Sequence, residues 1–418
     1  MKNAQDWAEI SGSKFADREG HRQWLFGQAE ALFDFFEPHS INPAGGFNTL
    51  DDDGLALPPT PGHDGCERQL HETTRMVHCF TIGKLVGRPH ADDFIDHGMD
   101  YLWNRHRDLK NGGYFWGVDN SSLTNPTKQA YGHAFVLLAS ASAKVAGHPD
   151  ADRLMEDITD VLMHHFWEPD IGATSEEYSA DWQAISDYRG QNSNMHLTEA
   201  LMAAFEATND QNYLKMAESI AELIIHRHAK EQGWRVAEHF DPAWQVDRDY
   251  AGDPMLRPAG TTPGHALEWA RLLVQLWELG GRQKEWIRDA AKNLFLNTID
   301  IGWDKRTGGF YYTLDWNNKP DRDDRFWWVC AEGIGAANAL GHAYDDPLFE
   351  TWYRRIWGFV DSHVIDHERG GWIPELDDNL HRVNRVFVGK PDLYHALQAC
   401  LLPLAQSGGS ITKGLQTK

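Results

Sequence analysis

The sequence has few cysteines, no run of Lys or Arg and no long apolar stretch, and each absence excludes a class of protein. The four cysteines form no Cys-x-x-Cys pair, which is typical of reduced thiols in the cytosol. A net charge of −23 without a basic run argues against nucleic acid or an anionic membrane as a partner. No 18-residue apolar run occurs, and Met1–Ile10 lacks the apolar core of a signal peptide. We therefore expect a soluble, cytoplasmic protein.

Several motifs of catalysis and metal binding are also missing. The sequence contains no phosphate-binding glycine loop and no Gly-x-Ser-x-Gly nucleophile elbow. His71-Glu-Thr-Thr-Arg75 begins like a zinc-protease motif, but Arg75 stands where the second histidine should be. The acidic segment 49–54 lacks the first ligand of a calcium loop and its closing glutamate. None of these common sites is therefore predicted.

What the sequence does have is a repeat. A turn of glycine, followed in most copies by an aromatic residue, recurs six times at intervals of 60–75 residues. Self-similarity at a fixed period indicates a repeated unit, and a unit of this length with two helical patterns and a turn is a helical hairpin. The turns are Gly45-Gly46-Phe47, Gly112-Gly113-Tyr114, Gly172-Ala173, Gly233-Trp234, Gly308-Gly309-Phe310 and Gly370-Gly371-Trp372.

A second series places one histidine or glutamate in each repeat, out of phase with the turns. Its members are His78, His133, His196, His265, Glu332 and His395. An open stack of hairpins would have atypical repeats as caps at its ends, and no repeat looks like a cap. We therefore predict a closed ring of six helical hairpins, an all-α fold in which the starts of the inner helices converge on one mouth.

No segment looks like a linker between domains. Residues 1–405 are therefore expected to form one catalytic domain, with 51–65 as a long loop over one rim and 406–418 as a disordered tail. Apolar periodicity predicts a helix over 212–227 and an inner, fully covered helix over 265–279. Short strands are expected at 113–117 and 309–315.

Three of the histidines start helices and have an acidic residue three positions later or earlier. The pairs are His196 with Glu199, His265 with Glu268, and His395 with Asp392. Residues at i and i+3 share a helix face, and a carboxylate beside an imidazole raises its basicity and selects its tautomer. Such a pair is suited to general acid–base catalysis. Two alternatives stay open, namely buried pairs that only join helices and a zinc site built from the three histidines.

These motifs together resemble the N-acylglucosamine 2-epimerase superfamily over roughly residues 24–404. The residues that carry the resemblance are Arg75 in Thr-Arg-Met-Val-His, Tyr131-Gly-His133, Asn192-x-Asn-Met-His196, Thr-Pro-Gly-His265-x-x-Glu268-Trp, Trp327-Trp328-x-x-Ala-Glu332 and Lys-Pro-Asp392-x-Tyr-His395. The resemblance implies an (α/α)6 barrel, no metal or organic cofactor, and interconversion of sugars at C1 and C2. The Asn-x-Asn-Met-His form is more similar to the aldose–ketose isomerase branch, which implies conversion of D-mannose, and of related aldoses such as D-lyxose, into D-fructose or the matching ketose.

The resemblance also implies roles for individual residues. It implies that His395 is the base at C2 and C1, that His265 with Glu268 opens the sugar ring or acts as the partner acid, and that His196 contacts sugar oxygens. It implies that the substrate is held by Arg75, Tyr131, His133, Asn192, Trp327 and Glu332. A sulfonated sugar would need a further cation, for which Arg257 or Arg248 is a candidate, although Arg257 is equally explained as a rim charge paired with a carboxylate.

Other functions remain open at this point. On the same fold, a 2-epimerase of the N-acylglucosamine or cellobiose type and a sulfoquinovose isomerase would use the same histidines. An inverting glycoside hydrolase would use two carboxyl groups among Glu268, Glu332 and Asp392. A non-catalytic sugar- or protein-binding ring would explain the aromatic residues only. The expected partner is a monosaccharide, and the expected assembly is a monomer or a homodimer.

Overall fold

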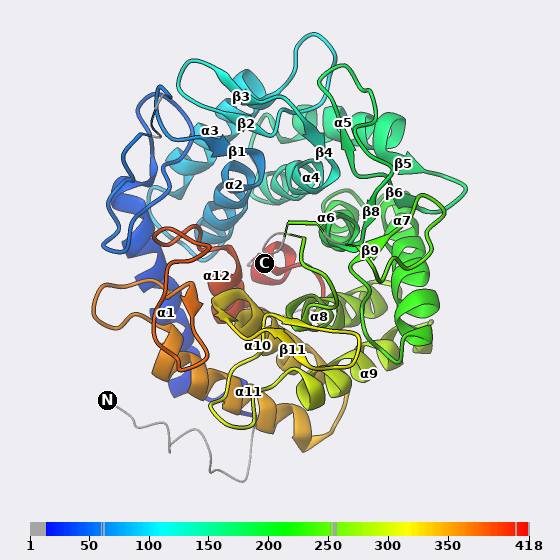
Figure 1. Cartoon of the computed structure of the whole chain (residues 1–418). Coiled ribbons are helices and arrows are strands. Elements are labelled where there is room, and N and C mark those ends of the chain that lie inside the picture. The colour runs from blue at the N-terminus through cyan, green and yellow to red at the C-terminus, as the bar shows by residue number, and fades with distance from the viewer. Residues whose placement is uncertain are drawn as a thin grey trace.

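Inner helices surround a common axis, and outer helices cover them from outside (Figure 1). The computed structural model describes residues 14–59, 61, 63–250, 252–253, 257–405 and 408–416. The inner helices are α2 (Leu70–Leu85), α4 (Ala130–Val145), α6 (Gln191–Thr208), α8 (Pro263–Leu279), α10 (Trp327–Ala343) and α12 (Tyr394–Leu401). The outer helices are α1 (Glu19–Ser40), α3 (Ala91–Tyr101), α5 (Ala151–Val161), α7 (Gln211–Ala221), α9 (Glu285–Ile301) and α11 (Pro347–Phe359). Each inner helix contacts the next, and α12 contacts α2, so the predicted (α/α)6 barrel is confirmed.

The two rings of helices differ in where their apolar residues lie. Inner helix α4 is buried almost all round and is rich in small residues such as Ala134, Ala139 and Ser140, which let neighbouring helices approach closely. Outer helix α5 buries a single stripe that includes Leu154 and Ile158, at the spacing of one helix face. The helix predicted over 212–227 is observed as α7 with its π-helical continuation, and the one over 265–279 is α8.

Four outer helices end in π-helical turns, η3 (Leu102–His106), η4 (Leu162–Phe166), η5 (Glu222–Ala229) and η6 (Val360–Val364). The chain then reverses through the repeated glycine turn. Gly113 and Gly309 have φ angles of 75° and 76°, in the left-handed region that favours glycine. The reversal is held by bridges from Arg107 to Tyr114 and from Trp303 to Phe310. Two short 3-10 helices, η2 (Phe15–Asp17) and η7 (Leu402–Leu404), lie near the ends of the described chain.

Short strands form a belt at the mouth of the barrel. They are β1 (Arg68–Gln69), β2 (Gly117–Val118), β3 (Leu123–Asn125), β4 (Lys128–Gln129), β5 (Trp167–Glu168), β6 (Ala173–Thr174), β7 (Glu177–Tyr178), β8 (Arg189–Gly190), β9 (His239–Phe240), β10 (Thr313–Leu314), β11 (Pro320–Arg322), β12 (Arg325–Phe326) and β13 (Glu375–Leu376). The strand that enters an inner helix pairs antiparallel with a strand of the following repeat in β1–β2, β4–β7, β8–β9 and β12–β13. Single bridges from Thr261 to Leu314 and from Leu50 to Lys390 do the same before α8 and α12. The start of every inner helix is therefore tied to its neighbour.

Buried ion pairs reinforce the belt. Lys128, just before α4, binds Asp108 at 2.9 Å, and Lys390, just before α12, binds Asp366 at 2.9 Å. Both aspartates also accept backbone N–H groups of their own glycine turn. Each pair therefore connects the end of an outer helix with the start of an inner one.

The C-terminal segment differs from the sequence prediction. The expected disordered tail contains a short helix, α13 (Ile411–Leu415), in which Ile411, Thr412 and Gly414 are buried. It lies near the barrel axis (red in Figure 1) and contacts α2, α4 and α6. The prediction of disorder was wrong because a segment of low apolar content can still pack when it closes an existing opening. Residues 406–407 and 417–418 lie outside the described part of the chain.

The remaining expectations concern the N-terminal half. Segment 51–65 has little regular structure, as expected of a long loop, and it follows Leu50, which bridges to Lys390 beside the mouth; residues 60 and 62 are not among those described. The expectation for Met1–Ile10 likewise falls outside the described residues. None of the helices in the described ranges has the length and hydropathy needed to cross a bilayer.

Replacing the two glycines of one turn by alanine is expected to have unequal effects on stability. Gly112 and Gly113 both have φ = 75°, but a Cβ on Gly112 would meet nothing within 4 Å, whereas one on Gly113 would lie 2.6 Å from the Trp182 ring. We expect Gly112→Ala to lower the free energy of unfolding by about 1–2 kcal/mol and Gly113→Ala by a further ~1–3 kcal/mol. Denaturant unfolding of both variants measures this difference, and equal losses would contradict it.

Candidate active site

Side chains from the first two turns of the inner helices, and Asp392 just before α12, come together around the barrel axis. In ring order, the contacts are Arg75–Tyr131 (2.9 Å), Tyr131–His196 (ring centroids 5.1 Å apart), His196–Glu268 (3.5 Å), Glu332–His395 (2.8 Å) and Asp392–Arg75 (2.9 Å). His265 and His395 both lie against Trp328, whose ring centroid is 5.2 Å and 5.7 Å from the two imidazoles. Four of the six positions predicted to converge therefore lie together, namely His196, His265, Glu332 and His395. His78 does not join them, because its Nδ1 bonds Ser142 deeper in the barrel.

His265 is held by a glutamate that the sequence analysis did not identify. Its Nδ1 lies 2.8 Å and 3.0 Å from the two carboxylate oxygens of Glu238, in the loop before β9. Burial favours the neutral form of Glu238, but His265 and the Gln191 amide stabilise the carboxylate, so its pKa lies below its ordinary value. An ionised carboxylate only accepts hydrogen bonds, so Nδ1 carries the hydrogen and Nε2 is the basic nitrogen.

The i, i+3 spacing predicted Glu268 as the partner of His265, and this prediction was wrong, because the partner is Glu238. His265 and Glu268 share a helix, but the loop before β9 reaches His265 from outside the ring. One signal in the sequence could have identified Glu238. It follows the glycine turn at Gly233, just as Glu176 follows the glycine turn at Gly172.

His395 is held in the same manner by Glu332 of the neighbouring helix α10. Its Nδ1 lies 2.8 Å from Oε1 of Glu332, and Oε2 of Glu332 accepts a 2.9 Å hydrogen bond from Nε of Arg271. Burial opposes ionisation of Glu332, but Arg271 and His395 overcome it and lower its pKa to about 2. The site thus contains two imidazoles, each bound through Nδ1 to an ionised carboxylate.

Asp392, the predicted partner of His395, binds Arg75 instead. It also accepts the backbone N–H of Tyr394 at the start of α12. Burial opposes ionisation of Asp392, but Arg75 stabilises the carboxylate and keeps its pKa below the ordinary value. Arg75 in turn donates to the hydroxyl of Tyr131, so the guanidinium is fixed between α4 and α12.

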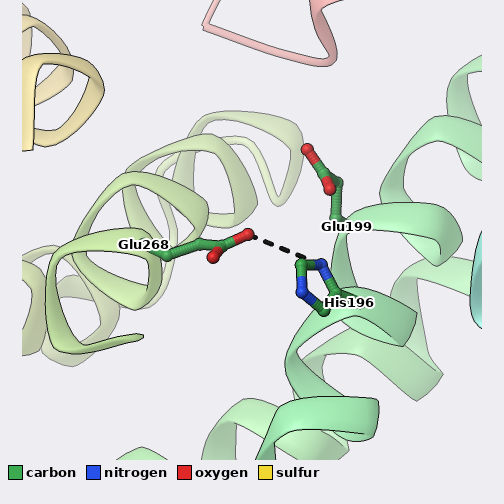
Figure 2. Close-up of side chains that lie close together, drawn as sticks. All are labelled: His196, Glu199 and Glu268. Carbon is green, nitrogen blue, oxygen red and sulfur yellow. Dashed lines mark ion pairs between the residues drawn. The ribbon is translucent and has the colours of Figure 1, made fainter. Parts of the chain in front are cut away.

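His196 and Glu268 face each other across the boundary of α6 and α8 (Figure 2). Their 3.5 Å separation is within ion-pair range, but burial works against charge on both groups. Burial, with help from Arg75, places the pKa of His196 well below its ordinary value. Burial and the charge of Glu332 place the pKa of Glu268 well above its ordinary value. Both shifts favour a neutral imidazole beside a carboxylic acid, unlike the histidine–carboxylate pairs of His265 and His395.

Glu199, predicted to orient His196, points away from it toward other partners. Its carboxylate accepts hydrogen bonds from the Tyr394 hydroxyl and, at 3.3 Å, from Arg271. In all three predicted pairs, the carboxylate that meets the histidine comes from another segment. The reason is geometric: in a closed ring each histidine is bordered by neighbouring segments, which are helix α8 for His196, helix α10 for His395 and the loop before β9 for His265.

Two other predicted residues lie away from these contacts. His133 is fully buried, and both of its ring nitrogens are occupied by its own repeat, with Nδ1 on the Gln129 carbonyl and Nε2 accepting from the Tyr114 N–H. Arg257 lies over the ring of Tyr188 and pairs with Glu177 at 3.5 Å, so it is a rim charge bound to a carboxylate. The prediction that these two bind substrate is not supported by their positions.

The remaining predicted residues flank the site. Asn192 is half-buried in the first turn of α6, with no partner for its Oδ1 within the described ranges. Trp327 packs on Phe387 at 4.9 Å and meets His395 only at 6.5 Å, so its neighbour Trp328 is the closer aromatic ring. His71, noted in the sequence only as the start of an incomplete zinc-protease motif, also borders the site: its ring stacks on Trp116 and lies 5.7 Å from Tyr131.

Two sets of side chains have ligand atoms close enough for a metal ion, and they share Glu268. They are His196 with Glu199 and Glu268, and Glu268 with Glu332 and His395. Arg271 already contacts all three of these carboxyl groups, at 2.9–3.5 Å. The positive charge that such a cluster requires is therefore supplied by a side chain.

Comparison with known proteins agrees with this geometry. The profile of the N-acylglucosamine 2-epimerase (GlcNAc 2-epimerase) family matches residues 45–399. A D-mannose isomerase of Pseudomonas cannabina pv. alisalensis is 40% identical over 94% of this chain and 96% of its own length, and one of Thermobifida fusca is 40% identical over 96% and 98%.

Solved structures give the same answer. A crystal structure of a D-mannose isomerase superimposes with a TM-score of 0.86 at 34% identity, over 94% of this chain and 99% of that one. A family 76 glycoside hydrolase (TM-score 0.63, 10% identity, 92% of this chain and 98% of that one) shares the fold alone. The matched profile and these near full-length relatives show that the chain belongs to the N-acylglucosamine 2-epimerase family.

Proposed function

We propose that this chain is a D-mannose isomerase, an aldose–ketose isomerase that interconverts D-mannose and D-fructose. The observation that carries the proposal is the pair of imidazoles, His265 and His395, each bound through Nδ1 to an ionised carboxylate and both in contact with Trp328. Such an imidazole accepts a proton at Nε2, and its carboxylate stabilises the imidazolium that results. Relatives at 36–40% identity that are D-mannose isomerases support the choice of sugar.

The first step is opening of the pyranose ring. The proton of the anomeric hydroxyl is removed, the bond from C1 to the ring oxygen breaks, and the ring oxygen takes up a proton. We assign this exchange to His265, with Glu238 as the carboxylate that balances its charge. The product is the open-chain aldose, whose C2 proton is acidified by the adjacent carbonyl.

The second step moves hydrogen between C2 and C1. His395 takes the C2 proton through Nε2, which gives a cis-enediol, and returns a proton to C1. In the same direction O1 changes from carbonyl to hydroxyl and gains a proton, while O2 changes from hydroxyl to carbonyl and loses one. Burial raises the pKa of Glu268, which lies beside His196, so we assign to this pair the proton given to O1 and the removal of the proton from O2. Arg75 stabilises the negative charge of the enediolate.

The proposal also includes the substrate contacts, the cofactor requirement and the cellular compartment. Arg75, Tyr131 and Asn192 would hold hydroxyl groups, and Trp328, with Trp327 behind it, would cover a face of the sugar. The contact between Arg271 and the carboxyl groups of the site supports the proposal that neither a metal nor an organic cofactor takes part. The four free thiols are compatible with a reducing cytoplasm. A free monosaccharide is the proposed partner, and the enzyme is proposed to be a monomer or a homodimer.

A sugar 2-epimerase is the second candidate. An epimerase removes the C2 proton from one face and returns it to the other, and two imidazoles on different helices suit that task as well. The occupied Arg257 gives no support to a sulfonated substrate.

Incubation with D-mannose in D₂O distinguishes the isomerase from the epimerase. We expect D-fructose as the main product, with deuterium partly incorporated at C1, because one base carries the proton between adjacent carbons and exchanges it with solvent. NMR of the product mixture measures both. D-glucose deuterated at C2 as the main product would instead establish the epimerase.

Substitution of His395 tests its role as the base. His395→Asn keeps much of the volume but cannot carry a proton, so we expect kcat to fall by about 10²–10⁴-fold while sugar binding persists. The matched control is His133→Gln, for which kcat and KM near wild type are expected together with lower stability. Wild-type turnover in His395→Asn would rule out the assignment, and a raised KM in His133→Gln would return His133 to the substrate site.

Removal of metal ions tests the cofactor. After exhaustive dialysis against EDTA we expect full activity, because the Arg271 side chain, and not a metal ion, contacts all three carboxyl groups. The assay is D-fructose formation before and after dialysis. Loss of activity that added Mn²⁺ or Zn²⁺ restores would overturn the cofactor-free mechanism.

A further inference from the structure

Arg271 is a buried cation on α8 to which the carboxyl groups of three helices converge. Its Nε lies 2.9 Å from Glu332 of α10, its Nη1 lies 3.3 Å from Glu199 of α6, and its Nη2 lies 3.5 Å from Glu268 of α8 itself. Only 2% of its side chain is exposed. A charge so deeply buried is stable only where its partners are fixed in place.

Each of the three carboxyl groups also contacts a different side chain of the site. Glu332 binds His395, Glu268 faces His196, and Glu199 accepts from the hydroxyl of Tyr394. The Tyr394 ring in turn packs against the Arg75 guanidinium at 4.8 Å. Contacts from Arg271 therefore reach side chains on α2, α6, α10 and α12.

The neighbouring helix makes room for this arginine. A Cβ at Gly335 of α10 would lie 2.9 Å from Cδ of Arg271, closer than side chains normally approach. Beneath the guanidinium, a cavity of about 10 Å³ leaves room for about one water molecule. Its lining includes Gln275, Gln398 and the α13 residue Ile411, so Arg271 lies between the site and the closed end of the barrel.

We infer that Arg271 is a positioning residue for the isomerase reaction: it divides the three carboxyl groups into an ionised one that holds His395 and a neutral one that serves as an acid. The inference rests on the proposed function. One cation shared by three buried carboxyl groups leaves excess negative charge, which favours protonation of the group that the cation stabilises least. Glu332 receives the shortest contact and Glu268 the longest, so we assign the ionised state to Glu332 and the neutral state to Glu268. The two groups therefore enter the reaction in different states.

Other charged and titratable groups also surround the guanidinium. They are Arg75 and His78 on α2, His196 and Glu199 on α6, Glu268 on α8, Glu332 on α10, and Tyr394 and His395 on α12. Removing one positive charge from this set favours protonation of every neighbour. The acid limb of the kcat/KM profile, which reports the groups that must be deprotonated, then moves to higher pH.

The test compares Arg271→Gln, Arg271→Lys and the control Arg88→Gln on D-mannose. Arg88 also binds three carboxylates, Glu30, Asp34 and Glu37, but it lies in the turn between α2 and α3. For Arg271→Gln we expect kcat at least about 100-fold lower with KM changed less than about threefold, and an acid limb about one pH unit higher. Arg271→Lys should return the acid limb of the kcat/KM profile to its wild-type pH but restore only part of kcat, because an ammonium cannot contact all three carboxyl groups at once. Arg88→Gln should change stability only.

A second pair of variants covers the case in which Arg271→Gln does not fold. Gly335→Ala retains every charge but displaces Arg271, so we expect kcat to fall about tenfold or more. The control is Gly341→Ala on the same helix, where a Cβ would make only an ordinary 3.7 Å contact and kcat should stay unchanged. Equal activity in the two alanine variants, or an unshifted limb in a folded Arg271→Gln, would overturn the inference.

Failure of the proposed function would look different. If the wild-type protein does not convert D-mannose, the substrate assignment fails, and the role of Arg271 is then decided by NMR of the imidazole nitrogens. We expect the Nδ1 signal of His395, which reports its hydrogen bond to Glu332, to change in Arg271→Gln and Gly335→Ala and to persist in Arg88→Gln. An unchanged signal in both site variants would contradict the role of Arg271 whatever the substrate.

Discussion

A buried carboxylate must be matched by a cation or by hydrogen bonds, and this requirement organises the barrel at two levels. In the belt, Asp108 and Asp366 meet Lys128 and Lys390, and these pairs join the end of one helix to the start of another. On the axis, three glutamates share the single Arg271. Breaking a buried pair by removing one partner is strongly destabilising, by about 3–5 kcal/mol. Contacts between buried carboxylates and cations therefore hold the starts of the helices in place and also fix the histidines.

Protonation state distinguishes three histidines that the sequence presents as equivalents. Two of them sit against ionised glutamates, which suits an imidazole that must gain and lose a proton. His196 faces Glu268, and burial lowers the pKa of His196 and raises that of Glu268, so the neutral form of each is favoured. A repeated scaffold thus supplies similar positions, and the charges around each position make the difference between a proton carrier and a hydrogen-bonding group.

The ring of hairpins and the convergence of its inner helices could be predicted from the sequence because both follow from periodicity, which a single chain displays directly. The partners of the histidines could not, since Glu238, Glu332 and Glu268 reach their imidazoles across loops and helix boundaries. Spacing along one helix describes that helix alone. The structural role of His133 was hidden for a similar reason: its partner, the N–H of Tyr114, belongs to the backbone and leaves no trace in the residue type.

The short helix α13 closes the end of the barrel opposite the belt, where Ile411 and Thr412 line a small cavity together with residues from the second halves of inner helices such as Met202 and Gln275. The barrel is accordingly a cup and not a tunnel. A sugar that enters must leave by the opening through which it came, so product departure and substrate entry exclude each other in time. A long glycan could not be threaded through and acted on at an internal unit, and only a free sugar or a chain end can reach the histidines.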